Sequence, residues 1–192
     1  MINSRIALTA ALAVALVPVV GAQVKGPSTA STPYVLPVLP GMETISVFTV
    51  DNTGPSPDDQ ILSYGLSGLP DGMGAFDNGD GTFTVLVNHE IGNTAGVVRA
   101  HGGKGAFVSR WIVKKDTLEV LAGEDLFKQV YGWDVANQRS NATPGVFSFN
   151  RYCSADLPDV TAFYNPATGL GTQERIFLNG EESGATGWAR GH

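Results

Sequence analysis

The sequence predicts an all-β protein, and three observations support this fold class. Its 192 residues include 24 glycines and 11 prolines, so turn formers are abundant. Short runs of β-branched and aromatic residues alternate with clusters of Gly, Pro, Asn and Asp along most of the chain. Beyond residue 22, no stretch sustains the 3.6-residue periodicity of an amphipathic helix. Such spacing is typical of a β-sandwich or a β-propeller.

The first 22 residues have the layout of a secretory signal peptide. A short head with one positive charge, Arg5, precedes an apolar run over residues 6–20, and small residues follow at 20–22. The run is shorter than the roughly 20 residues that cross a bilayer. We therefore expect residues 1–22 to be cleaved, no stable membrane span, and a secreted or periplasmic protein. The lack of paired arginines favours the Sec-type route. A buried N-terminal helix or an uncleaved anchor is the alternative.

The segment after the expected cleavage site is different in character from the rest. Residues 23–42 are rich in Pro, Ser, Thr and Gly, and they predict an extended lead-in rather than a folded unit. The folded part is expected at residues 43–192. It opens with strand-like runs at 45–50 and 61–66, which are separated by a polar loop at 51–59.

Two β-hairpins are predicted in the middle of the chain. In the first hairpin, we expect strands at 73–76 and 82–87 with a turn at 77–81. In the second, we expect strands at 106–113 and 117–121 with a turn at 114–116. Between the hairpins lies a polar, Gly-rich stretch, in which we expect His101 to belong to a mobile loop. Further strands are expected at 147–151 and 175–178, while 125–130 fits either one helical turn or a strand.

Charge and cysteine content narrow the possible functions. Twelve Lys and Arg residues face 18 Asp and Glu residues, which gives a net charge of −6. Such a chain repels phosphate backbones, so we expect no nucleic-acid partner. The one cysteine, Cys153, cannot form an internal disulfide. It is either buried as a small hydrophobic residue or used as a metal ligand or nucleophile.

Polar residues at three strand ends are candidate metal ligands. Asp71 lies in a Pro-Asp-Gly turn at a strand entrance, and it is either a turn residue or a carboxylate ligand. Asn88, His89 and Glu90 follow a strand-like run. Alternation along a strand directs Asn88 and Glu90 to one side and His89 to the other. Amide and carboxylate oxygens suit Ca²⁺, and imidazole suits transition metals. The same three residues also fit a polar strand end that bonds to its own loop.

The third cluster combines Cys153 with Glu181 and Glu182. The two glutamates follow an apolar run, and neighbouring strand residues point to opposite faces. A buried carboxylate without a partner is unfavourable, and a metal ion is one partner that compensates for it. A solvated pair of loop residues is the alternative interpretation.

Four segments, in this order, resemble the PhoX-type alkaline phosphatase family and its secreted relatives. The segments are Leu-Pro-Asp-Gly-Met-Gly-Ala at 69–75, Val-Leu-Val-Asn-His-Glu at 85–90, Asn-Arg-Tyr-Cys at 150–153, and Glu-Arg-Ile-Phe-Leu-Asn-Gly-Glu-Glu at 174–182. The resemblance extends from about residue 65 to residue 192. One departure is Gly180, which stands where the family usually has a cysteine before the paired glutamates.

The resemblance implies a β-propeller that hydrolyses phosphate monoesters with iron and calcium. Cys153 would match the iron-binding cysteine, and Glu181 or Glu182 would match family carboxylates. Glu90 would line the site, with Asp71 and Asn88 as outer or calcium-side ligands. Metal ions would polarise a small phosphorylated substrate while an oxygen nucleophile attacks. The 192 residues would then be an incomplete propeller of about two blades, the N-terminal part of a longer protein, and inactive alone.

Two further hypotheses compete with this one. The chain fits a non-catalytic, secreted, calcium-binding β-propeller segment that binds surface partners. It also fits a degenerate gene fragment without function. Metal content separates the enzyme from the binding module. Iron together with calcium favours the enzyme, whereas calcium alone, or no metal, favours the binding module.

Overall fold

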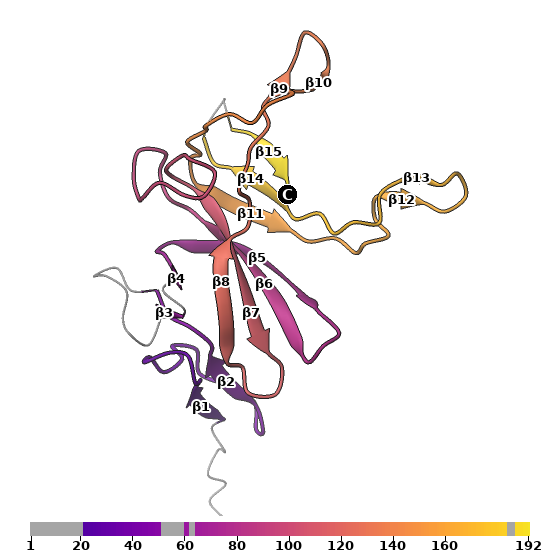
Figure 1. The fold of residues 1–192 in the computed structure, drawn as a ribbon. Helices are drawn as coiled ribbons and strands as arrows, with labels where there is room; N and C mark the ends of the chain where they lie inside the picture. Colours follow the sequence, from indigo (N-terminus) through magenta and orange to yellow (C-terminus); the bar gives the residue numbers. More distant parts are fainter. Residues whose placement is uncertain (1–20, 51–59, 62–63, 184–186) are drawn as a thin grey trace, which may run out of the picture.

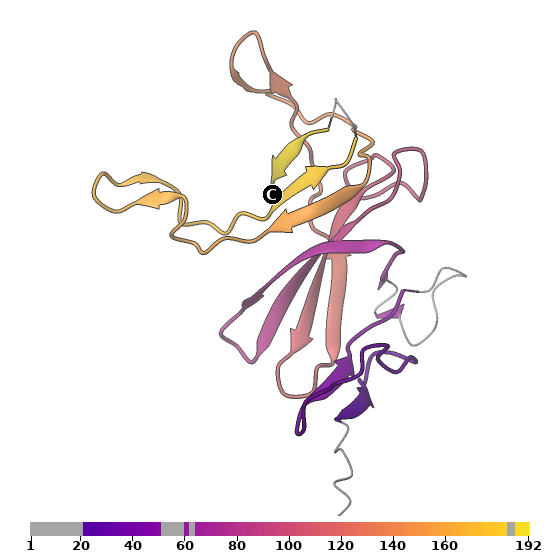
Figure 2. The ribbon, with the colours of Figure 1, turned by 180° about the vertical axis from the view of Figure 1, so that it is seen from behind.

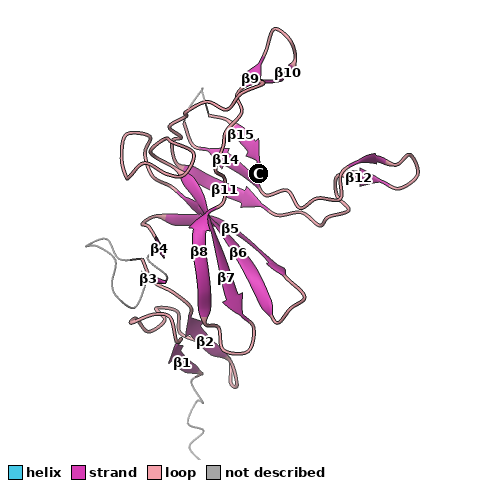
Figure 3. Ribbon diagram, viewed as in Figure 1, coloured by secondary structure: helices cyan, strands magenta, loops and turns pink. Residues whose placement is uncertain are grey.

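The computed structural model describes residues 21–50, 60–61, 64–183 and 187–192. All regular secondary structure in these ranges is β-strand, which confirms the predicted all-β class (Figure 3). Across these ranges there is no helix with the length and apolar character needed to cross a membrane. The expected signal peptide lies outside the described residues except for 21 and 22, and the expected loop at 51–59 lies outside them entirely.

A four-stranded antiparallel sheet forms the centre of the fold (Figures 1 and 2). Its strands follow one another in chain order: β5 (Pro70–Asp77), β6 (Thr82–His89), β7 (Phe107–Lys114) and β8 (Val120–Asp125). The first predicted hairpin is confirmed, because β5 pairs with β6 across residues 77–81. The carboxylates of Asp77 and Asp80 accept the backbone N–H groups of Gly79 and Thr82 at 2.7 and 3.0 Å, and so they hold the turn.

The second predicted hairpin is confirmed as a pairing of β7 with β8, but its second strand lies later than expected. The sequence places this strand at 117–121, whereas β8 begins at Val120. Leu118 explains the difference, because its φ of 57° and its N–H bond to the Lys114 carbonyl make it part of the turn.

A three-stranded sheet of order β11–β14–β15 packs against the central one. Its strands are β11 (Tyr152–Asp156), β14 (Leu178–Glu181) and β15 (Ala189–Gly191). The strands expected at 147–151 and 175–178 are thus displaced toward the C-terminus. Arg151, with a φ of 45°, interrupts the extended backbone just before β11. The segment expected at 125–130 is neither a helix nor a continuous strand in the structure.

The remaining strands are short and peripheral. They are β1 (Ala22–Lys25) with β2 (Glu43–Ser46), β3 (Gln60–Ile61) with β4 (Tyr64–Gly65), β9 (Trp133–Asp134) with β10 (Arg139–Ser140), and β12 (Tyr164–Asn165) with β13 (Leu170–Gly171). The β9–β10 and β12–β13 hairpins extend away from the body as two arms (Figure 1). The lead-in is joined to β2 by the parallel β1–β2 pair, and to the central sheet by Ser28, whose Oγ accepts the Val120 N–H at 2.9 Å.

Two apolar clusters cover the two faces of the central sheet. One contains Val87, Trp111 and Val113 with Leu66 and Val120. The other joins Leu86 and Val108 to aromatic residues of the second sheet and its flanks, namely Phe149, Tyr152 and Phe177. Because side chains alternate along β6 and β7, both strands are buried on both faces. The second sheet therefore covers the face that carries Leu86 and Val108.

His101 lies in a turn of the loop that the sequence predicts, and its side chain packs against this second cluster. Its side chain is buried, with the ring 4.9 Å from that of Phe127 and 5.4 Å from that of Phe149. Nε2 lies 3.1 Å from the Phe147 carbonyl oxygen, to which it donates. Burial lowers the pKa of His101 despite that hydrogen bond and the nearby charge of Asp125.

This shift predicts a loss of stability in mild acid. The unfolded chain protonates His101 near pH 6.5, whereas the folded chain does so only at lower pH, so stability falls as the pH drops below that value. Denaturant unfolding of the wild-type chain and of His101→Gln at pH 7.5 and 5.5 measures the effect. The variant should lose less free energy of unfolding between the two pH values, while carboxylate titration is common to both proteins. An equal loss would contradict this.

Candidate functional site

Strands β5 and β11 approach each other so closely that only glycine fits at one position. A Cβ on Gly72 of β5 would come within 2.5 Å of both the Cys153 carbonyl oxygen and the Ala155 nitrogen. The β5–β6 pairing is irregular in the same place, between Pro70 and Met73. Because Gly72 carries no side chain, β11 can lie against β5, and Cys153 comes close to the beginning of that strand.

Three of the predicted metal ligands converge at this approach. Asp71 is in β5, Glu90 directly follows β6, and Cys153 is in β11. One potential ligand atom from each residue lies within 4.8 Å of the other two. The Glu90 N–H donates to the Leu69 carbonyl at 2.8 Å, which fixes the backbone where the glutamate emerges. Asp71 is exposed and the other two are half-buried, so the group is accessible from solvent on the Asp71 side.

The thiol of Cys153 lies in acidic surroundings. It donates to Glu182 Oε2, which is 3.3 Å from Sγ, and the Arg151 guanidinium is 3.4 Å from the same carboxylate oxygen. Burial raises the pKa of Cys153 to about 12, and the hydrogen bond to Glu182 and the charges of Glu90 and Glu182 act in the same direction. The thiol is therefore neutral at pH 7 in the free protein. A bound cation would favour the thiolate instead.

The two neighbouring glutamates point to different places, as strand alternation predicts. Glu182 lies beside Cys153. The Glu181 carboxylate accepts the N–H of Asn150 at 2.6 Å and borders a separate cavity. The structure therefore brings Glu182 next to the group of three and leaves Glu181 outside it.

Asn88 is fully buried and connects the two sheets. Its Nδ2 donates to the carbonyl oxygens of Cys153 and Ser154 at 3.3 and 3.0 Å, and its Oδ1 accepts from Asn179 Nδ2 at 3.2 Å. Both ends of the amide are thus bonded within the protein. Asn88 lies behind the group of three and joins its strands.

His89 faces the opposite side of the central sheet, again as alternation predicts. Its Nε2 lies 2.8 Å from Ser109 Oγ, and its Nδ1 lies 3.1 Å from the Ser67 carbonyl oxygen. The ring stacks on that of Phe107 at 4.1 Å. Burial lowers the pKa of His89 to about 4, so the imidazole is neutral at pH 7.

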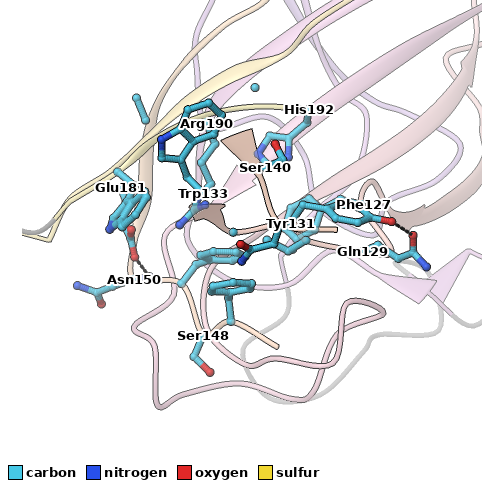
Figure 4. A pocket seen from close by; sticks show the side chains of 18 of the residues that line it. Phe127, Gln129, Tyr131, Trp133, Ser140, Ser148, Asn150, Glu181, Arg190 and His192 are labelled. Carbon is cyan, nitrogen blue, oxygen red and sulfur yellow. Dashed lines mark hydrogen bonds between the residues drawn. The ribbon is translucent and has the colours of Figure 1, made fainter. Parts of the chain in front are cut away.

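A second candidate site was not apparent in the sequence. A cavity of about 810 Å³ lies on the Glu181 side of the second sheet (Figure 4). Glu181 is the one predicted site residue in its lining. The other lining residues come from 93, 127, 129–133, 140–141, 147–150, 183 and 188–192. These segments are far apart in the chain, so no local spacing marks the cavity.

Comparisons with known proteins do not identify a relative. No protein-family model matches the chain, and neither a curated protein nor a solved structure matches it.

The close approach at Gly72 predicts that Gly72→Ala is destabilising. The added Cβ must displace backbone atoms of β11, so we expect the free energy of unfolding to fall by about 1–3 kcal/mol. Denaturant unfolding measures this. Gly92→Ala is the matched control, because a Cβ there meets only Asn150 Oδ1, at 3.8 Å. Equal stability of the two variants would contradict the tight contact.

The buried amide of Asn88 predicts a structural effect on substitution. In Asn88→Ala, two carbonyl groups and the Asn179 amide lose their partner, so stability should fall by about 1–3 kcal/mol. Asn137→Ala, at an exposed amide on the β9–β10 arm, should change it by less than about 0.5 kcal/mol. Unfolding experiments without added metal measure both variants. A stable Asn88→Ala that has lost metal binding would instead show that Asn88 is a ligand.

Proposed function

We propose that this chain belongs to an exported, metal-dependent phosphoesterase-like β-propeller. Asp71, Glu90 and Cys153 would hold its metal, with Glu182 beside them. The observation that carries the proposal is that potential ligand atoms from three distant segments lie within 4.8 Å of one another. Each segment contains one of the motifs that resemble PhoX-type phosphatases. The substrate class is a phosphate monoester.

The donor set fits iron together with calcium. A cysteine thiolate is a soft ligand that suits transition metals, whereas carboxylate oxygens suit calcium and also complete an iron site. Iron is therefore expected at Cys153, and calcium on the carboxylate side at Asp71 and Glu90. The free site gathers acidic side chains around a thiol, and a cation would compensate their mutual repulsion.

The bound metal would polarise the phosphoryl group and neutralise its charge. The chain's own residues would prepare the site for this anion. The exposed side of the group, at Asp71, would admit the substrate. The guanidinium of Arg151 is partly exposed beside Glu182 and would attract the negatively charged phosphate. The hydrogen bond from the Glu90 N–H to Leu69 would keep the ligand strand in place.

The arrangement of sheets supports the propeller part of the proposal. A four-stranded antiparallel meander, such as β5 to β8, is the unit from which propeller blades are made. The β11–β14–β15 sheet follows it in the chain and packs on it, as the start of a second blade would. Export rests on the signal-like residues 1–22 of the sequence.

A non-catalytic calcium-binding segment is the second candidate function. The carboxylates of Asp71, Glu90 and Glu182 favour it, because oxygen donors alone satisfy calcium. In that case Cys153 would not bind metal, and iron would not be retained.

Metal binding by the purified chain tests the proposal. After dialysis against Fe²⁺ without oxygen and against Ca²⁺, elemental analysis should find both metals. Cys153→Ala should lose the iron, because it removes the thiolate donor. Glu90→Gln should weaken metal binding by about tenfold or more, because it replaces a charged carboxylate with a neutral amide. Asp156→Asn, which removes an exposed carboxylate of the same strand β11, is the matched control and should bind like the wild type.

Each outcome favours one of the two functions or neither. Retention of calcium alone by the wild type would favour the binding module. Binding of neither metal, or equal losses in Glu90→Gln and Asp156→Asn, would overturn the metal site. Because the resemblance implies that these residues are inactive alone, metal content rather than hydrolysis of a phosphate monoester by this chain separates the two functions.

A further inference from the structure

The cavity beside Glu181 is separate from the group of proposed metal ligands. It lies between β14, β15, the β9–β10 arm and residues 147–150, and its volume is about 810 Å³ (Figure 4). Asp71, Glu90 and Cys153 are not part of its lining. A volume of this size is in the usual range for small-molecule sites.

Large aromatic side chains line the cavity and remain open to solvent. Tyr131, Trp133 and Trp188 belong to its walls, yet their exposed fractions are 48%, 50% and 53%. Aromatic rings that are half buried in a concave site offer flat apolar faces to a ligand. The C–H face of a pyranose ring is a flat apolar surface that packs well on such rings.

Arg190 places in the same cavity a positive charge that lies beside the Tyr152 hydroxyl and has no acidic partner among the described residues. Its guanidinium lies over the rings of Phe149, at 4.3 Å, and Trp188, at 5.3 Å, so its plane is fixed. Its Nε is buried without a hydrogen-bond partner, and it makes no ion pair with any described residue. The nearby Glu181 carboxylate instead accepts from Asn150. A buried N–H without an acceptor is rare, and a guanidinium is well suited to an oxyanion.

Neutral polar groups occupy the rest of the wall. Gln129, Ser140, Asn141 and Asn150 offer amide and hydroxyl groups that both donate and accept. The Tyr131 hydroxyl donates to Gln129 Oε1 at 3.1 Å, which orients that amide and leaves its NH₂ available (Figure 4). Such groups match the hydroxyls of a sugar, each of which is both donor and acceptor.

We propose that this cavity binds a sugar that carries an oxyanion. The oxyanion would lie on Arg190, the ring would pack on Trp133 or Trp188, and the hydroxyls would bond to the amide side chains. A uronic acid carboxylate and a sugar phosphate offer the same contacts to the guanidinium. The site is independent of the proposed metal ligands, since they belong to another surface.

Calorimetric titration of the full chain with glucose, glucuronate and glucose 6-phosphate at one ionic strength tests this. At least one charged sugar should bind about tenfold or more tightly than glucose, because a hydrogen bond to a charged group contributes enough binding free energy for a tenfold change in Kd. The sugar that binds more tightly identifies the oxyanion as carboxylate or phosphate. Arg190→Gln should abolish the preference, and Trp133→Ala should weaken the tighter ligand because it removes a stacking surface.

Two controls make the test specific. Arg139→Gln removes an exposed arginine of β10 outside the cavity lining and should bind like the wild type. Binding should also persist in Cys153→Ala and with a chelator present, so the outcome does not depend on the metal site.

If Arg190→Gln unfolds, the affinity of Trp133→Ala for the tighter ligand still tests the cavity, because Trp133 is half exposed on an arm and its replacement should not unfold the chain. Equal affinity for all three sugars, no binding of any, or equal effects of Arg139→Gln and Arg190→Gln would overturn the proposal.

Discussion

The contact between the backbones of β5 and β11 at Gly72 is the constraint on which the candidate metal site depends. It brings the second sheet onto the Leu86 and Val108 face of the central one, where Phe149, Tyr152 and Phe177 complete the core. The Asn88 amide holds β6 and β11 together in the same region by donating to two carbonyl groups of β11. A larger residue at Gly72 would separate the strands, and the ligand atoms of Asp71 and Cys153 with them.

The chemistry at this contact is set by an excess of acidic groups. A neutral thiol among carboxylates is the arrangement that burial and nearby negative charge impose on Cys153 in the free protein. Arg151 offsets part of that charge through Glu182. The arrangement therefore resembles a binding site more than a structural core, because a well-packed core avoids gathering like charges.

The strand β14 lies between two candidate sites that differ in charge. On one side, Glu182 adds to the acidic group near Cys153. On the other, Glu181 borders a cavity in which Arg190 and large aromatic side chains predominate. Two adjacent glutamates thus belong to different sites because successive side chains point to opposite faces at the end of a strand. A cation and an anion would be favoured on the two sides.

Local features of the sequence determined the all-β class, the two central hairpins and the side of the sheet that Asn88, His89 and Glu90 face. Turn chemistry and the period of two act between near neighbours, so no tertiary contact is needed to predict them. Tertiary structure decided where β8 and β11 begin, because Leu118 and Arg151 adopt a positive φ that their residue types do not predict. It also decided that Glu181 leaves the predicted ligand set, and that Arg190 joins aromatic residues from distant segments. Such convergence depends on strand packing across the whole chain, which no local pattern encodes.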